Sequence, residues 1–210
     1  MTVNWPRAHD LLRLTDAEVF RPDDLSSFEP AHKALAAAPW VVVRHDLAPH
    51  GRLPVGVRGE TREQRWAGTI AERDIAEHVP PQALLTRSAS RPLPVFTALR
   101  VLAELPLPAW AAAWGPGGSA GFELASGAPA ARPGSDLDLV IRAPDPVPAP
   151  FVAELLHELG RALPVRVDAQ VQTPIGAVSA AEYAREPGLV LLRADTGPRL
   201  VTDPWHTVAP

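Results

Sequence analysis

The sequence has no cysteine, only one lysine and no long uninterrupted apolar run. Without cysteine the chain forms neither disulfides nor a thiolate zinc site, which suits the cytoplasm. The start, MTVNWPRAHDLLRL, has too few consecutive apolar residues for a signal peptide. Prolines interrupt the longest apolar stretches, at Pro39, Pro106 and Pro108. We therefore expect a cytoplasmic protein with no membrane partner.

A surplus of positive charge is also missing, since the formal net charge is −4. Proteins that wrap duplex nucleic acid concentrate basic residues on one face, so we expect no nucleic acid partner. Lys33 is the single lysine among 20 basic residues. The abundance of arginine is weak evidence for function, although its guanidinium suits phosphate recognition.

The chain has enough apolar residues for a sizeable core and enough proline to divide it. Its 210 residues, 46% hydrophobic, fit one large or two small domains. The segment Val79–Pro94 is rich in proline and serine, and proline disfavours helix in the residue before it. We therefore predict an α+β fold with a substrate- or partner-binding domain at 1–90 and a catalytic domain at 91–210.

The spacing of apolar residues predicts most of the secondary structure. Helical spacing predicts helices at Pro30–Ala38, at 95–105 and in FVAELLHELGRAL. Runs rich in β-branched residues or leucine predict strands at Trp40–Arg44 and in LVLLRA. Composition also favours helix from Glu60 onwards and in GAVSAAEYAR.

The most informative stretch is 114–142, WGPGGSAGFELASGAPAARPGSDLDLVIR. A glycine-rich turn carrying Gly118 and Ser119 precedes a strand with Asp136 and Asp138. Alternate residues of a strand share a face, so the two carboxylates lie side by side with the leucines and isoleucine opposite. Such like charges repel, and a divalent cation such as Mg²⁺, which usually also binds substrate phosphates, offsets this. A helix starting near Ser119 would direct backbone N–H groups at a phosphate.

A third carboxylate stands on a later strand. In VRVDAQV the valines and alanine alternate with Arg166, Asp168 and Gln170, which places Asp168 on a polar face. A third metal ligand or a base would occupy such a position.

Three arginines in the first half of the chain form a candidate anion-binding patch. Arg58, Arg62 and Arg65 are four and three residues apart, so they share one face if the segment is helical. They would then bind the phosphates of a substrate. The alternative is a solvated face balanced by neighbouring glutamates.

The pattern of Gly118-Ser119, Asp136-Leu137-Asp138 and Asp168 resembles the nucleotidyltransferase superfamily of DNA polymerase β. The resemblance implies a mixed sheet flanked by helices in the C-terminal domain. It also implies that the three aspartates hold two Mg²⁺ ions and that Gly118 and Ser119 hold the phosphates. Asp168 would complete a metal shell or accept the hydroxyl proton. The GPG run before Gly118 departs from the common turn.

A narrower resemblance covers nearly the whole chain. PVGVRG with a following QR, WGPGGSAGFELASG with SDLDLVIR, and VDAQVQTP are similar to the malonate decarboxylase holo-acyl-carrier-protein synthases, the phosphoribosyl-dephospho-CoA transferases of bacterial malonate utilisation. This resemblance implies transfer of the prosthetic group from triphosphoribosyl-dephospho-CoA to a serine of the apo acyl carrier protein, with release of pyrophosphate. Arg58, Arg62 and Arg65 would then grip the dephospho-CoA part or an acidic carrier.

Three alternatives remain at this point. Another nucleotidyltransferase could use ATP or a different nucleoside triphosphate on another acceptor. A noncatalytic binding module could keep the fold, although the three carboxylates argue against it. Gly117 to Gly121 also satisfies G-x-S-x-G, and Asp203 and His206 follow in the order of an α/β-hydrolase triad. A hydrolase lacks support because no apolar strand is expected immediately before Ser119 and no HGGG-type motif lies upstream.

Overall fold

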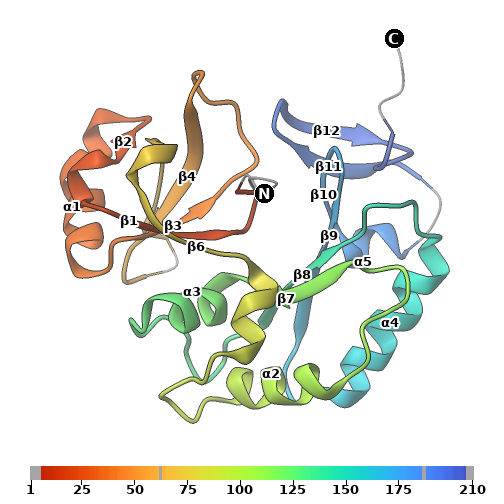
Figure 1. Cartoon of the computed structure of the whole chain (residues 1–210). Helices are drawn as coiled ribbons and strands as arrows, with labels where there is room; N and C mark the ends of the chain where they lie inside the picture. Colours follow the sequence, from red (N-terminus) through yellow and green to blue (C-terminus); the bar gives the residue numbers. More distant parts are fainter. Residues whose placement is uncertain (1–5, 62, 186–187, 207–210) are drawn as a thin grey trace. The chain divides into compact units, whose positions relative to one another are not determined.

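The computed structural model describes residues 6–61, 63–185 and 188–206. The chain has the expected α+β fold and divides into two compact units, Met1–Pro80 and Pro81–Pro210 (Figure 1). The division lies at the start of the proline-rich segment Val79–Pro94. The composition of the sequence had suggested a boundary at position 90, near the end of this segment. None of the described helices is long and apolar enough to cross a membrane.

The first unit is built on a six-stranded sheet in the order β2-β5-β4-β3-β1-β6, in which every neighbouring pair is antiparallel. Its strands are β1 (Leu11–Leu14), β2 (Arg21–Pro22), β3 (Trp40–Val43), β4 (Arg52–Arg58), β5 (Arg65–Ala71) and β6 (Ile75–Val79). Helix α1 (Phe28–Ala37) contributes Ala31 and Leu35 to the same apolar core as Val41 and Val55. The helix predicted at Pro30–Ala38 and the strand predicted at Trp40–Arg44 are both confirmed.

The prediction of helix from Glu60 onwards is wrong, because the chain forms a β-hairpin there. Strand β5 pairs along its whole length with β4, from Arg58 opposite Arg65 to Arg52 opposite Ala71. The helix-forming residues are confined to the connection, which the Gly59 N–H closes by donating to the Gln64 carbonyl at 2.8 Å. Pairing with a buried neighbouring strand outweighs helix propensities of a few tenths of a kcal/mol, about 0.7 at most for ordinary residues.

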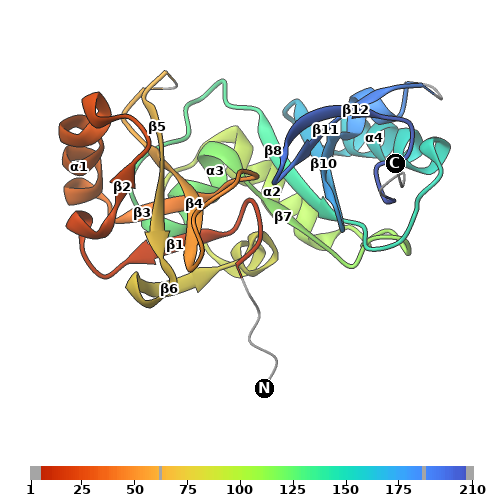
Figure 2. The same cartoon turned by 90° about the horizontal axis from the view of Figure 1, so that it is seen from above.

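The second unit contains a mixed six-stranded sheet in the order β12-β11-β10-β9-β8-β7 (Figure 2). Its strands are β7 (Ala113–Pro116), β8 (Leu137–Arg142), β9 (Val167–Thr173), β10 (Gly176–Ser179), β11 (Val190–Ala194) and β12 (Gly197–Val201). Its helices are η4 (Pro81–Thr86), α2 (Pro94–Glu104), α3 (Gly118–Ser126), α4 (Ala149–Ala162) and α5 (Ala180–Tyr183). Strands β8 and β9 are parallel and α4 provides the crossover that such a pair requires.

Apolar periodicity explains the two long helices of this unit. Helix α2 has proline in its first turn and buries Val95, Ala98, Leu99 and Leu102, at the spacing of one helix face. Helix α4 buries a comparable stripe of Val152, Leu155 and Leu159. Each of these leucines contributes about 1.5–3 kcal/mol when fully buried. Both helices confirm the predictions made from spacing.

The helix predicted for GAVSAAEYAR is only half correct. Its first half is strand β10, in which Ala177 and Val178 are fully buried and pair with β9. Helix α5 starts only after Ser179, whose hydroxyl accepts a hydrogen bond from the Glu182 N–H at 3.4 Å. Alanine-rich composition favours helix, but burial between two neighbouring strands decides for strand.

The segment that composition marked as a linker is packed into the second unit. Leu84 of η4 is fully buried, and η4 lies against β7. At Gly115 of β7 a Cβ would overlap the Pro81 carbonyl, so only glycine permits this approach. Val79–Pro94 is therefore largely a structural part of the second unit rather than a free connector.

Candidate active site

The glycine-rich turn joins β7 directly to α3 and lies against β8. Strand β7 pairs antiparallel with β8, with Pro116 opposite Leu139, and the Gly117 N–H donates to the Asp138 carbonyl at 2.8 Å. Gly118 has φ +54°, a left-handed conformation that costs other residues about 1–2 kcal/mol. A Cβ on Gly118 would also overlap the Asp138 carboxylate. The backbone of the turn and the Asp138 side chain are thus in contact.

Helix α3 begins at this turn, as the sequence predicted. It runs from Gly118 to Ser126, and no side chain caps its N-terminus. The N–H groups in the first turn of a helix lack intrahelical acceptors, and the helix dipole makes this end attractive to anions. The turn therefore offers backbone donors, next to the Asp138 carboxylate, that suit a phosphate.

Two of the three predicted carboxylates are direct neighbours on parallel strands. Asp138 of β8 is in register with Asp168 of β9, and paired residues project from the same face of a sheet. On β8 the residues on the other face, Leu137 and Leu139, are buried. Asp138 is half-buried and Asp168 is exposed. The sequence separates these aspartates by 30 positions and the fold brings them side by side.

Asp136 lies one residue before β8 and has a different neighbour. Its Oδ2 is 3.8 Å from the Arg166 Nη1, and the Arg166 side chain is 76% exposed and the Asp136 side chain 43%. Exposed ion pairs of this kind contribute little, about 0–1 kcal/mol. Arg166 therefore leaves Asp136 able to turn towards a cation.

The three aspartates offer oxygen donors of the kind that Mg²⁺ prefers. Within the described residues, no three His, Cys, Asp or Glu side chains are already grouped as a complete metal site. Mg²⁺ does not need such a cage, because it commonly binds one or two carboxylates together with water and substrate phosphates. The pair Asp138 and Asp168, beside a phosphate-suited turn, fits this incomplete donor set.

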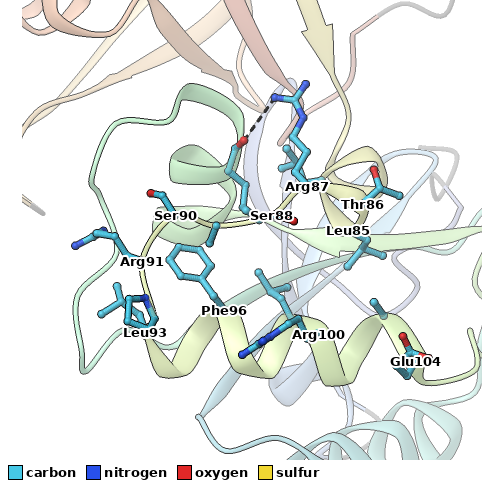
Figure 3. Close-up of a pocket in the computed structure, with 16 residues that line it drawn as sticks. Leu85, Thr86, Arg87, Ser88, Ser90, Arg91, Leu93, Phe96, Arg100 and Glu104 are labelled. Atoms are coloured by element: carbon cyan, nitrogen blue, oxygen red, sulfur yellow. Dashed lines mark hydrogen bonds between the residues drawn. The ribbon is translucent and has the colours of Figure 1, made fainter.

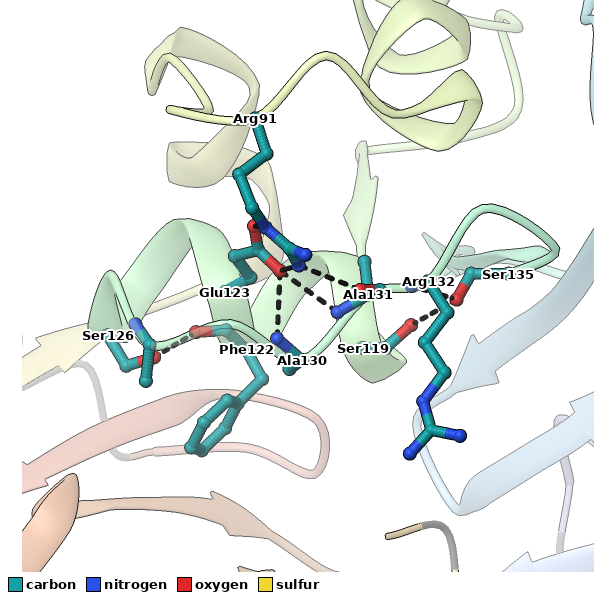
Figure 4. Close-up of polar contacts among 10 residues, drawn as sticks. Arg91, Ser119, Phe122, Glu123, Ser126, Ala130, Ala131, Arg132 and Ser135 are labelled. Atoms are coloured by element: carbon teal, nitrogen blue, oxygen red, sulfur yellow. Dashed lines mark hydrogen bonds and ion pairs between the residues drawn. The ribbon is translucent and has the colours of Figure 1, made fainter. Parts of the chain in front are cut away.

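Two serines bridge the turn and the segment before β8. The Ser119 hydroxyl lies 3.4 Å from the Ser135 hydroxyl, which also accepts from the Arg132 N–H at 2.9 Å (Figure 4). These contacts tie the start of α3 to the residue next to Asp136. Ser119 thus lies in the first turn of α3, next to Gly118.

An ion pair between a buried carboxylate and a partly exposed arginine, which sequence reasoning missed, holds the same segment. Glu123 of α3 is only 4% exposed, and its carboxylate pairs with the Arg91 guanidinium. It also accepts from the Ala130 and Ala131 N–H groups at 2.8 and 2.9 Å, and Arg91 donates to the Ala131 carbonyl (Figure 4). One carboxylate thus fixes the chain between α3 and β8.

The electrostatics of this ion pair are those of a satisfied buried charge. Burial acts to raise the pKa of Glu123, but hydrogen bonds from Arg91 and the two backbone N–H groups outweigh it, so the pKa is lowered. The hydrogen bond to Glu123 raises the pKa of Arg91. The sequence contains one sign of this ion pair, which is the glutamate within the apolar stretch GFELASG. A carboxylate that is buried with its apolar neighbours requires a partner.

The three predicted arginines belong to the first unit. Arg58 and Arg65 face each other across the β4–β5 hairpin rather than sharing a helix face, and Arg62 lies outside the described residues. The two arginines are therefore cross-strand neighbours of a sheet and not neighbours on a helix face.

Comparison with known proteins decides the family. The family model "Phosphoribosyl-dephospho-CoA transferase MdcG C-terminal domain" matches residues 83–204, and the corresponding N-terminal domain model matches 7–81. The chain belongs to this transferase family. It is 42% identical over 203 residues to the phosphoribosyl-dephospho-CoA transferase of Pseudomonas putida (strain GB-1), covering 97% of both chains.

Other family members are equally similar along their length. The phosphoribosyl-dephospho-CoA transferase of Pseudomonas aeruginosa is 43% identical, covering 96% of this chain and 94% of its own. That of Klebsiella pneumoniae is 40% identical, covering 96% and 97%. No solved structure matches the chain.

The geometry around Ser119, Asp203 and His206 does not support the alternative that the chain is an α/β-hydrolase. A strand does precede the serine turn, contrary to expectation, because Trp114, Gly115 and Pro116 belong to β7. However, the left-handed residue is Gly118, whereas in a nucleophile elbow the strained turn carries the serine itself. Asp203 pairs locally with His206 at 2.8 Å, and this hydrogen bond lowers the pKa of Asp203.

The second unit also contains a separate cavity that is lined by both apolar and charged side chains. It encloses about 560 Å³ between the segment Leu84–Leu93, helix α2 and Leu124 of α3 (Figure 3). Arg87, on its wall, donates to the Leu124 and Ala125 carbonyls at the end of α3. None of the predicted site residues lines this cavity.

Proposed function

We propose that this chain transfers the phosphoribosyl-dephospho-CoA group from triphosphoribosyl-dephospho-CoA to a serine of the apo acyl carrier protein of malonate decarboxylase. The family match and the names of the relatives support the transferred group. The observation that carries the chemistry is the register of Asp138 with Asp168 beside the Gly118 turn. We also propose that the acceptor is this carrier protein and that the reaction takes place in the cytoplasm.

We further propose that the second unit belongs to the nucleotidyltransferase superfamily of DNA polymerase β. The element order α2-β7-α3-β8-α4-β9 supports this, as does the mixed sheet that carries the glycine turn and the carboxylates on adjacent strands. Asp136, Asp138 and Asp168 would hold Mg²⁺, two ions in the full arrangement. When bound, Mg²⁺ neutralises the departing pyrophosphate and favours ionisation of the attacking hydroxyl.

The reaction is a single displacement at phosphorus. The serine oxygen of the carrier forms a bond to the α-phosphorus, and the bond from that phosphorus to pyrophosphate breaks. Gly118 and Ser119 would bind the β- and γ-phosphates through backbone N–H groups and the hydroxyl, which stabilises the negative charge that develops there. Asp168, the more exposed of the register pair, would complete the metal shell or accept the serine proton. Arg58, Arg62 and Arg65 would bind the anionic donor or carrier.

The test is transfer measured on both products. Purified enzyme is incubated with triphosphoribosyl-dephospho-CoA, Mg²⁺ and the apo carrier, while pyrophosphate release and the mass of the carrier are followed. We expect release that requires carrier and metal, with a matching mass gain on one serine. Equal release from ATP without any carrier would replace the proposed reaction by another nucleotidyl transfer. No release under any condition would favour a binding module.

A further inference from the structure

Gln170 lies on β9 next to the carboxylates but has no role in the mechanism above. It follows Asp168 by two residues, so both side chains project from the same face of the sheet, about 6.6 Å apart along the strand. Across the sheet Gln170 is in register with Val140 of β8 and Ser179 of β10. It therefore occupies the next row after Asp138 and Asp168.

The side-chain oxygen of Gln170 is buried without a donor. Within the described part of the chain, no donor lies within hydrogen-bond distance of Gln170 Oε1. The neighbouring Ser179 hydroxyl accepts from the Glu182 N–H at the start of α5. A buried polar atom without a partner destabilises the fold, and native proteins keep few of them. Such an atom beside an active site indicates a group that a ligand satisfies.

The chemistry of the amide selects the kind of ligand group. An amide oxygen accepts hydrogen bonds, so it does not pair with phosphate oxygens, which are also acceptors. A hydroxyl both donates and accepts, so it satisfies the Gln170 amide in either orientation. In the proposed donor, the group attached directly to the triphosphate is a ribose with hydroxyls.

We propose that Gln170 binds a ribose hydroxyl of the donor, so that the sugar lies over the Val140–Gln170–Ser179 row while its phosphates lie at the aspartates. This inference rests on the proposed function. Gln170 is then a binding residue that distinguishes a sugar triphosphate from a bare polyphosphate. Binding of the sugar at Gln170 would position the α-phosphorus, which bears the sugar, for attack by the serine.

The test compares two ligands that differ only in the sugar. Full-length wild-type enzyme and the Gln170→Met variant are titrated with ribose 5-triphosphate and with inorganic tripolyphosphate, each with Mg²⁺. Methionine keeps the length of glutamine without its amide. We expect roughly fivefold weaker binding of ribose 5-triphosphate and unchanged binding of tripolyphosphate, since one net hydrogen bond is worth about 1 kcal/mol.

Thermal unfolding separates binding from a structural role. Removing a buried atom that lacks a partner is neutral or stabilising, so Gln170→Met should unfold at the wild-type temperature or above it. A clear drop in that temperature, or equal weakening of both ligands, would assign Gln170 to the fold and overturn the inference.

The remaining outcomes separate this inference from the proposed function. If wild-type enzyme binds both ligands and Gln170→Met changes neither, only the inference fails. If the variant instead raises only the KM for the carrier, the hydroxyl belongs to the acceptor serine and the ribose assignment is wrong. If wild-type enzyme binds neither ligand, the proposed function fails and the inference with it.

Discussion

Asp138 and Asp168 lie directly opposite each other on the parallel strands β8 and β9. Two carboxylates in this relation repel each other, at a cost of up to about 1 kcal/mol. In the proposed mechanism, a divalent cation bound by both carboxylates would convert this repulsion into attraction.

Replacing Asp168 by asparagine should separate stability from activity. We expect Asp168→Asn to unfold at or slightly above the wild-type temperature without divalent cation, because the repulsion is gone. Mg²⁺ should raise the unfolding temperature of the wild type more than that of the variant. Transfer should fall at least about 100-fold, as when a group that stabilises developing charge is lost. Transfer within twofold of wild type would contradict the assignment.

The two left-handed glycines at the ends of α3 form a matched pair of test sites. Gly118 and Gly127 have φ +54° and +74°, but a Cβ meets the Asp138 carboxylate at Gly118 and open space at Gly127. Either change to alanine should cost about 1–2 kcal/mol of unfolding free energy through backbone strain. Only Gly118→Ala should also reduce transfer, by at least about tenfold, because a displaced Asp138 loses its orientation. Equal kcat/KM in the two variants would count against this.

The Glu123 network makes a prediction about pH. Its folded-state pKa lies below the ordinary value of 4.5, so its stabilisation is fully present above pH 4.5 and is lost as pH falls through the folded-state pKa. Glu123→Ala leaves the buried Ala131 N–H without this acceptor and Arg91 without its carboxylate partner, which should cost about 1–3 kcal/mol at pH 7. Denaturant unfolding of both proteins between pH 7 and pH 3 measures the difference. We expect it to narrow below pH 4.5, and a constant gap would disprove the linkage.

Arg58 and Arg65 should affect binding rather than the chemical step. Replacing both by glutamine should raise the KM for the donor roughly tenfold with little change in kcat, and the effect should shrink at high salt. Arg13→Gln is the control, because Arg13 is another exposed arginine of the same sheet, paired with Glu77. A similar KM change in the control would point to net charge instead.

Local pattern was sufficient for much of the fold and for the position of the candidate site. Helices α1, α2 and α4 follow from apolar spacing, and the Gly118 turn and the strand face of Asp138 follow from a motif and strand alternation. These features depend on residues within one or two turns of each other. These helices and this turn can therefore be predicted from a single sequence.

Features that depend on distant partners could not be obtained in this way. Strand β5 exists because β4 lies beside it, although its neighbouring residues favour helix. The pairing of Arg91 with Glu123 spans 32 positions, and nothing in one sequence selects that arginine among the others. The register that aligns Asp138 with Asp168 likewise depends on how α4 returns the chain to the sheet.

The close approach of η4 to Gly115 determines where a fragment that contains only the second unit should begin. Because η4 lies against β7 in the direction of a Gly115 Cβ, it covers one face of the strand that leads into the Gly118 turn. Without η4 this face would be exposed, and exposed apolar surface promotes aggregation. A catalytic fragment that begins at residue 91 would lose this cover, whereas one that begins before Pro81 would keep it. The independent solubility of the catalytic half thus depends on six residues that the proline content alone would assign to a spacer.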